Sequence, residues 1–299
     1  MPADWTGRSA HRERGIALLV VLWACTLLAI LLGGFATLAR TEATQTRYLS
    51  TRAQLRYIAE AGVMRAMAEI TAKDGGRWIG DGRPYGLSID GQSVDIRIVD
   101  ELGKVDINTV DPQVLRNLFV AAGMDAADAT ALADNVRESR DAAGAFNRAE
   151  GAQRYTQAGQ AGGPRYSEFN APDELQTVLG MTPALYRKIA PVLTVWSRRA
   201  TPAPAFAPPL ALAALPGMDM ATAKRFASTR DAINAKMPLP MLPNGMPMGN
   251  TRGSNVRTIV ASATGKDGTV SRVSATVRID HVRGRGSASI LRWQEDAAE

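Results

Sequence analysis

Two different hydrophobic patterns follow each other near the start of the chain. Residues 16–39 carry no charged side chain, and a helix of that length would be roughly 36 Å long, enough to cross a lipid bilayer. Over residues 55–70, apolar or small residues instead recur at helical spacing, which marks one face of an amphipathic helix. No proline interrupts the two patterns, so we predict one continuous helix over residues 16–72. Gly33-Gly34 is the one expected kink, and Gly75-Gly76 should end the helix.

Beyond this helix, strand patterns enclose a helical region. Residues 85–99 alternate around Asp90-Gly91, which predicts a hairpin. Low hydrophobicity predicts an irregular, mobile loop over 144–172, and 201–209 forms a linker rich in proline and alanine. This order predicts an α+β fold with an inserted all-α lobe. The patterns place helices at 111–122, 125–139, 173–178, 183–192 and 210–232, a strand-like stretch at 192–197, and later strands at 256–263, 270–280 and 288–293.

Composition narrows the chemistry that this chain could perform. The chain has 35 basic and 29 acidic side chains, and the net charge of +6 neither requires nor forbids a polyanionic partner. The single cysteine, Cys25, excludes an internal disulfide and a cage of thiolate ligands, and it falls in the apolar segment. His11 and His281 lie near opposite ends of the chain. No serine nucleophile elbow, phosphate loop or His-Glu-x-x-His motif occurs, so we expect neither an enzyme nor a metal site.

Six acidic residues lie in and after the predicted hairpin. A cation site is the functional interpretation, but no Asp-x-Asp-x-Asp-Gly loop is present. We therefore interpret these residues as parts of solvated faces and as helix caps. They are Asp90, Asp95, Asp100, Glu101, Asp106 and Asp111.

The charges before the apolar segment predict its orientation in a membrane. His11–Gly15 is short and mostly basic, and basic residues ahead of a first apolar segment hold that end in the cytoplasm. A secretory signal peptide would have a shorter apolar region followed by a site of small residues. A signal anchor in front of an unspecified periplasmic domain is the simplest alternative.

A basic leader that ends in Gly15, an apolar helix and an amphipathic extension together resemble the precursors of type IV pilin-like proteins. In that family the prepilin peptidase cuts after the glycine on the cytoplasmic side and methylates the new N-terminal amine. The resemblance therefore implies cleavage between Gly15 and Ile16, and methylation of Ile16.

One position departs from the common pattern of that family. Most members carry a glutamate at the fifth mature position, where this chain has Val20. A carboxylate in an apolar helix is costly unless it meets a partner, which in the family is usually the new amine of the preceding subunit. A subunit with no subunit above it has no use for that carboxylate. The K-type minor pseudopilin of the type II secretion system (general secretion pathway protein K) is known for lacking it, and this chain resembles that type.

Further stretches resemble the same family. Residues 100–108 fit its Asp-x-x-Gly-Lys-Val-Asn-Leu-Asn pattern, and residues 173–191 resemble its Glu-Leu-x-x-Val-x-Gly and Tyr-x-x-Ile-x-Pro signatures. The C-terminal strands, closing with residues 291–295, are also similar. The linker at 201–209 lacks the Asn-x-Asn-Thr-Ala run that the family usually has there.

The resemblance implies a fold with a long N-terminal helix packed on a small antiparallel pilin-like sheet, and with an inserted all-α lobe that contains helix-hairpin-helix-like units. The implied parts are a cytoplasmic leader (1–15), a transmembrane half (16–39) and a periplasmic half (40–72) of the helix, the first part of the sheet (73–109), the inserted lobe (110–236), a loop rich in proline and methionine (237–254) and the C-terminal strands (255–299).

The resemblance also implies a function, which is to cap the tip of the type II secretion pseudopilus and to contribute to its initiation and to the export of folded proteins. The implied partners are the I- and J-type minor pseudopilins, the prepilin peptidase and the inner membrane, crossed once with the bulk of the chain in the periplasm. Some K-type relatives bind calcium in the helical lobe. Between Gly144 and Tyr166 this chain offers only Glu150 as an acid, so we expect no calcium and no other cofactor.

A second class of function rests on two glycine turns in the helical region. Residues 212–230 have helix-hairpin-helix spacing around Pro216-Gly217, and residues 178–185 form a looser copy around Gly180. The backbone N–H groups at the helix start after such a turn can bind a phosphate. The alternative function is therefore that of a membrane-anchored DNA-binding protein of a DNA-uptake system.

The surrounding residues favour a packing role for these turns. Asp219 follows the Pro216-Gly217 turn, at a position where a basic residue would help to bind DNA. Lys224, Arg225 and Arg230 are the local basic residues, and no aromatic stacking platform accompanies them. We therefore favour a compact two-helix packing unit and expect no nucleic-acid partner.

Overall fold

The computed structural model describes residues 13–72, 78–144, 146–160, 162–232, 241–242, 253–282 and 285–296. The chain divides into two compact units, Met1–Leu55 and Arg56–Glu299. Helix α1 (Glu13–Thr71) is continuous across that boundary, as predicted, and runs unbroken through Gly33-Gly34. Gly75-Gly76, most of the leader and most of the loop at 237–254 lie outside the described residues.

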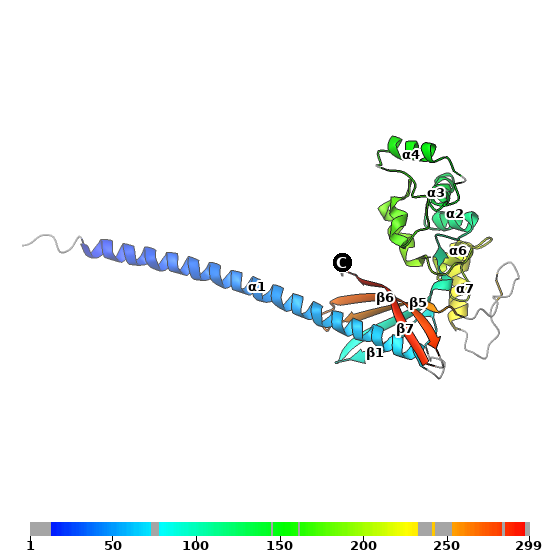
Figure 1. The fold of residues 1–299 in the computed structure, drawn as a ribbon. Coiled ribbons are helices and arrows are strands. Elements are labelled where there is room, and N and C mark those ends of the chain that lie inside the picture. The colour runs from blue at the N-terminus through cyan, green and yellow to red at the C-terminus, as the bar shows by residue number, and fades with distance from the viewer. Residues whose placement is uncertain are drawn as a thin grey trace, which may run out of the picture. The chain divides into compact units, whose positions relative to one another are not determined.

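A five-stranded antiparallel sheet joins segments from both ends of the second unit (Figure 1). The predicted hairpin is confirmed as β1 (Asp81–Ile89) and β2 (Gln92–Asp100), with Asp90-Gly91 as its two-residue turn. The three C-terminal strands are also confirmed, as β5 (Val256–Thr264), β6 (Val270–Val282) and β7 (Arg285–Asp296). The strand order is β1-β2-β5-β6-β7. The helical lobe is therefore an insertion between two strands, β2 and β5, that are neighbours in the sheet.

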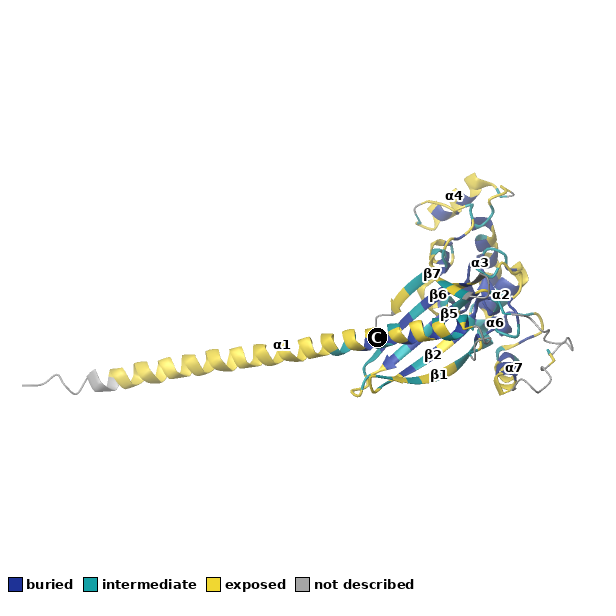
Figure 2. Cartoon of the chain, turned by 60° about the horizontal axis from the view of Figure 1, so that its bottom comes forward, coloured by how far each residue is buried: buried dark blue, intermediate teal, exposed yellow. Residues whose placement is uncertain are grey.

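The last turns of α1 pack closely on this sheet. Ala59, Val63 and Ala66 are fully buried, and they recur at the spacing of one helix face. Gly62 lies among them, and a Cβ there would be 3.0 Å from Cγ1 of Val94. Small residues therefore set the distance between helix and sheet, which supports the predicted packing. Figure 2 shows the contrast between the exposed first part of α1 and the buried positions on the strands.

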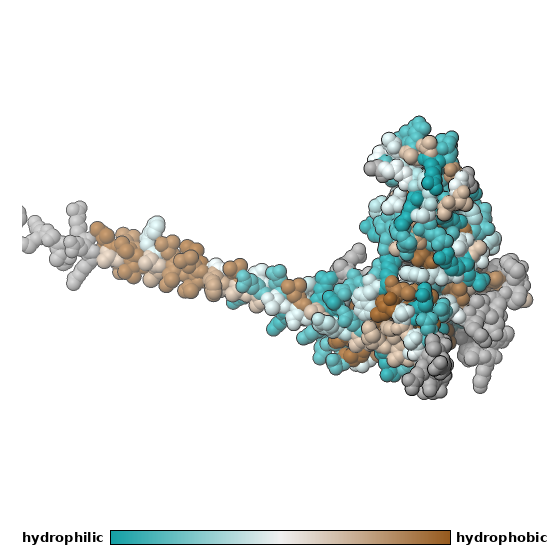
Figure 3. All heavy atoms as spheres, in the orientation of Figure 1, coloured by the Kyte–Doolittle hydropathy of each residue, from teal (hydrophilic) through white to brown (hydrophobic). Residues whose placement is uncertain are grey.

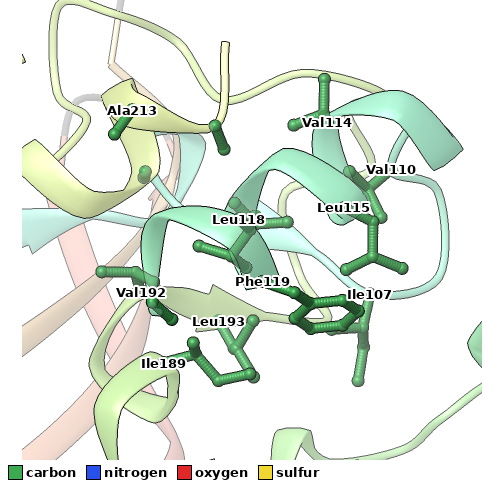
Figure 4. Packing of buried hydrophobic residues seen from close by; sticks show 14 of the residues in the cluster. Ile107, Val110, Val114, Leu115, Leu118, Phe119, Ile189, Val192, Leu193 and Ala213 are labelled. Atoms are coloured by element: carbon green, nitrogen blue, oxygen red, sulfur yellow. The ribbon is translucent and has the colours of Figure 1, made fainter. Parts of the chain in front are cut away.

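The inserted lobe is all-α apart from one short pair of strands. Leu118 and Phe119 of α2 are buried with Ile189 and Leu193 in its core (Figure 4). Apolar side chains from distant parts of the chain thus meet in one cluster. In chain order the elements are η1 (Glu101–Gly103), β3 (Val105–Asp106), α2 (Pro112–Ala121), α3 (Ala126–Ser139), α4 (Arg148–Gln157), η2 (Pro172–Thr177), α5 (Pro183–Ile189), η3 (Ala190–Val192), β4 (Leu193–Thr194), α6 (Pro209–Ala213) and α7 (Met220–Ala232).

The loop predicted over residues 144–172 is wrong in its middle part, because α4 lies there. Asn147 caps this helix: its Oδ1 accepts from the N–H of Ala149 at 3.1 Å, and its Nδ2 donates to Oε1 of Glu150 at 3.0 Å. Tyr155 is buried, and its hydroxyl accepts from the N–H of Leu179 at 3.0 Å. A cap and one aromatic anchor therefore hold a helix that is too polar to show an apolar stripe.

Other elements also differ from their predicted form, and the helix predicted at 210–232 is divided into α6 and α7. The helix predicted at 183–192 becomes α5 followed by the 3-10 turn η3, because Pro191 has no N–H to continue the α-helical hydrogen bonds. The helix predicted at 173–178 is the 3-10 helix η2. The strand-like stretch at 192–197 is reduced to β4, which pairs in parallel with β3.

The close approach at Gly62 generates a prediction. Gly62→Leu should lower the free energy of unfolding by about 1–3 kcal/mol, because the new side chain would overlap Val94 and Ala261 on the sheet. Urea unfolding of the full-length protein in a mild detergent measures this change. Ala61→Leu is the matched control, since Ala61 is exposed one position away on the same helix. Equal stability of the two variants would contradict the proposed packing.

Candidate functional site

The first half of α1 presents apolar side chains on every side. The large hydrophobic residues between Ile16 and Leu38 that are exposed include Leu18, Trp23 and Phe35. By length and composition, α1 is the one helix in the described part of the chain that could cross a membrane, and none of its most apolar window is buried. Figure 3 shows this first part of α1 in brown and the change to polar residues further along. Such a surface needs lipid or other helices around it.

The polar groups within this apolar segment are satisfied by the helix itself. The hydroxyl of Thr26 donates to the carbonyl oxygen of Trp23 at 2.8 Å, and that of Thr37 donates to the carbonyl oxygen of Gly34 at 2.8 Å. These local bonds leave neither hydroxyl without a partner in an apolar environment. The segment is therefore compatible with lipid along its length.

The residues predicted for processing all lie at the start of α1. Gly15 and Ile16 are within its first turns, because the helix begins at Glu13. Val20 has 62% of its surface exposed, as part of the same apolar face. Val20, the fifth residue after Gly15, thus contributes an apolar side chain and no charge to the helix surface.

A buried ionic cluster connects the end of β2 to the sheet. Glu101 is fully buried, and its Oε1 lies 2.6 Å from Nζ of Lys104 and 2.6 Å from the hydroxyl of Thr258 on β5. That hydroxyl in turn lies 2.8 Å from the hydroxyl of Thr276 on β6. The first residues of the lobe are therefore tied to the two central strands that follow it in sequence.

Asp100 makes a second connection at the same place. Its carboxylate accepts hydrogen bonds from the N–H of Leu102, which it caps, and from both the N–H and the hydroxyl of Ser254 at 2.8 and 2.7 Å. Burial raises the pKa of this carboxyl group, although the hydrogen bonds from Ser254 and Leu102 oppose the shift. Asp100 thus joins the segment that leaves the sheet to the segment that returns to it.

These contacts correct the interpretation of the acidic residues. Asp111 caps α2 and Asp100 caps η1, as predicted, but Asp100, Glu101 and Asp106 are buried and are not parts of solvated faces. Each also has a partner far along the chain (Ser254, Thr258 and Arg198), so local sequence could not reveal their burial. One signal was available in the Asp-x-x-Gly-Lys stretch: a Cβ at Gly103 would lie 2.3 Å from the carbonyl oxygen of Phe206, so only glycine fits there.

A third connection joins the lobe to the last strand. Arg292 of β7 forms an ion pair with Asp173 of η2, and the hydroxyl of Tyr186 on α5 donates to Oδ1 of Asp173 at 2.5 Å. Burial and this hydrogen bond to a carboxylate raise the pKa of Tyr186. Asp173 therefore holds two helical elements and one strand together.

In the structure, both glycine turns lie between helical elements. Gly180 has a φ of 89° and Gly217 a φ of 77°, a region that side chains other than glycine rarely adopt. Gly180 separates η2 from α5, while Pro216-Gly217 separates α6 from α7. Both turns lie in the helical lobe, far along the chain from Gly15 and Val20.

Each of these turns is followed by the N-terminal end of a helix. There, a side chain of the protein itself accepts a hydrogen bond from a backbone N–H group. The hydroxyl of Thr182 accepts from the N–H of Leu185 at 3.2 Å, and Oδ1 of Asp219 accepts from the N–H of Thr222 at 2.7 Å. Hydrogen bonds to Thr222 lower the pKa of Asp219, so its negative charge would repel a phosphate.

Arg230, a basic residue of the helix that follows the Pro216-Gly217 turn, also has a packing role. Arg230 is buried, and its Nη1 donates to the carbonyl oxygens of Pro204 and Ala207 at 2.9 and 2.7 Å. These contacts support the packing role of the turns over phosphate binding. Among the described residues, no group of three or more His, Cys, Asp or Glu side chains could hold a metal ion.

Comparisons with known proteins agree with this architecture. Residues 97–198 match the family model described as "Type II secretion system (T2SS), protein K". The fold is similar to that of a chain in the crystal structure of the GspK-GspI-GspJ complex from the type 2 secretion system of enterotoxigenic Escherichia coli, with a TM-score of 0.55 and 13% identity over 85% of this chain and 100% of that chain. No curated protein matches the chain. The family match confirms the K-type resemblance, and the structural match confirms the α+β fold.

The buried cluster at the end of β2 generates a second prediction. Lys104→Met should lower the free energy of unfolding by about 3–5 kcal/mol, because it leaves the carboxylate of Glu101 buried without a cation. Urea unfolding of the full-length protein in detergent measures the loss. Arg97→Met removes one partner of an exposed ion pair with Asp95 and should cost less than about 1 kcal/mol. Similar losses in the two variants would show that the buried pair has no special role.

Proposed function

We propose that this type II secretion minor pseudopilin of the K type caps the tip of the pseudopilus. The observation that carries the proposal is Val20, which is exposed on an apolar helix where a carboxylate would otherwise meet the amine of another subunit. Without that carboxylate, α1 still packs beside apolar helices below it but offers no charged contact to a subunit above.

We further propose how the chain reaches that position. The basic leader before Gly15 stays in the cytoplasm, residues 16–39 cross the inner membrane once, and the sheet and lobe lie in the periplasm. The prepilin peptidase then cuts between Gly15 and Ile16 and methylates the new amine of Ile16. The cut removes the charges that hold the helix end in the cytoplasm, so the apolar helix can leave the bilayer to join other helices.

The proposed partners are the I- and J-type minor pseudopilins. The similar solved structure is of a complex between GspK, GspI and GspJ, and it supports such a partnership for a chain with the same fold. The proposed mechanism is assembly: the tip complex initiates the fibre, and growth of the fibre contributes to the export of folded proteins from the periplasm. No reaction step is needed in this role.

The first test concerns processing. Gly15→Val should leave an uncleaved precursor, because a β-branched side chain next to the cut bond obstructs the peptidase. Mass spectrometry of the protein purified from native membranes measures the N-terminus, which should be Ile16 in the unchanged protein. The control is Gly33→Val, where a Cβ meets nothing within 4 Å. Normal processing of Gly15→Val would count against the assignment.

The second test concerns the tip position. Val20→Glu should be cleaved normally but should also enter the fibre below its tip, because its carboxylate can pair with the amine of another subunit. Crosslinking, with a count of copies per fibre, detects this change. Val21→Glu, one position away on the same exposed segment, should not gain the pairing. A Val20→Glu subunit that remains at the tip in unchanged copy number would remove the basis of the capping proposal.

A further inference from the structure

Two arginines on α1 directly follow the apolar segment. Arg40 is the first charged residue after residues 16–39, and Arg47 follows seven positions later. Seven residues are close to two helical turns, so the two side chains lie on the same side of the helix. Both are exposed, and neither has an ion-pair partner in the part of the chain that the structure describes.

The helix geometry aims both side chains at the surface of a bilayer. Arg47 lies roughly 10 Å beyond Arg40 along the helix axis, and helix side chains tilt toward the N-terminus, which here is the direction of the apolar segment. A long arginine stem can therefore reach back to the headgroup layer. Arg52 lies roughly 18 Å beyond Arg40, more than two Debye lengths (~8 Å each) away.

The surroundings leave the two guanidinium groups available. The nearest acid, Glu42, lies two positions after Arg40 and so points to another side of the helix. The hydroxyl of Thr44 donates to the carbonyl oxygen of Arg40 at 2.9 Å, a bond to its backbone and not to its side chain. Tyr48 is about half exposed beside Arg47, and tyrosine is typical of membrane interfaces.

We propose that Arg40 and Arg47 form a binding site for the phosphate headgroups of anionic phospholipids in the outward-facing leaflet. A guanidinium group binds phosphate through two parallel hydrogen bonds. The inference rests on the proposed membrane orientation of residues 16–39. It adds a polar anchor that fixes the depth of α1 in the bilayer before the chain joins a fibre.

The experiment measures lipid selectivity of the full-length protein. Phosphatidylglycerol or phosphatidylcholine is titrated into the detergent-solubilised chain, and native mass spectrometry measures the affinity for each lipid. The unchanged chain should prefer phosphatidylglycerol, and the double variant Arg40→Gln/Arg47→Gln should bind it about 30-fold more weakly, which corresponds to about fivefold for each arginine near a charged lipid surface.

The control removes two charges from the same helix. Arg52 and Arg65 lie beyond the reach of the headgroups, and among the described residues the ion pair that Arg52→Gln/Arg65→Gln breaks is the exposed one between Arg65 and Glu69. The affinity of this variant for phosphatidylglycerol should change less than twofold. Equal weakening in both double variants would overturn the site, because it would reflect net charge and not position.

A second measurement separates this inference from the proposed topology. The unchanged chain should enter nanodiscs made of phosphatidylcholine alone. A chain that enters them but shows no preference for phosphatidylglycerol overturns the headgroup site and leaves the membrane anchor intact, whereas a chain that stays outside overturns both. If the Arg40→Gln/Arg47→Gln variant keeps the lipid preference but loses crosslinks to a neighbouring pseudopilin, the arginines bind an acidic protein partner, and the lipid proposal is wrong.

Discussion

A long helix without charge and without a polar side must be kept away from water, and this constraint decides how the chain is used. The side chains of residues 16–39 are exposed all round α1. Burying each large apolar side chain is worth about 1.5–3 kcal/mol, so the segment as a whole strongly favours lipid or other helices. Hydrocarbon tails and the apolar faces of similar helices meet the same need, so the proposed roles as membrane anchor and as part of a fibre make the same demand on this segment.

In the folded part of the chain, a large helical lobe is inserted into a small sheet, and the sheet remains continuous. β2 and β5 are neighbours in the sheet, but the entire lobe lies between them in sequence. Asp100 closes the gap by holding Ser254, and the Glu101–Lys104 pair attaches the first turn of the lobe to Thr258. Because these contacts sit where the chain leaves and re-enters the sheet, the lobe is fixed at its base as well as by its own core.

Most elements followed from local patterns, because their causes are local. The turn at Asp90-Gly91, the continuous helix and the three last strands depend on spacing and on turn residues, and all were predicted. Helix α4 was missed since its stability comes from the Asn147 cap and from a hydrogen bond between Tyr155 and Leu179, a residue that lies well after the helix. The burial of Asp100 and Glu101 was also missed, because each has a partner more than 150 positions away.

The apolar middle of residues 16–39 and the polar residues on either side of it have different effects on where the chain resides. Lipid and neighbouring helices present similar apolar surfaces to the middle of this segment. The middle therefore favours both environments alike and cannot by itself determine where the chain resides. The choice must therefore be made at the two polar ends. In the proposed topology, the basic residues before Gly15 hold one end of the helix in the bilayer until they are removed, and Arg40 and Arg47 face the opposite surface at the other end. The proposed cleavage would change the first end alone, so in this scheme the two arginines at the second end would set the free energy needed to lift the chain out of the membrane.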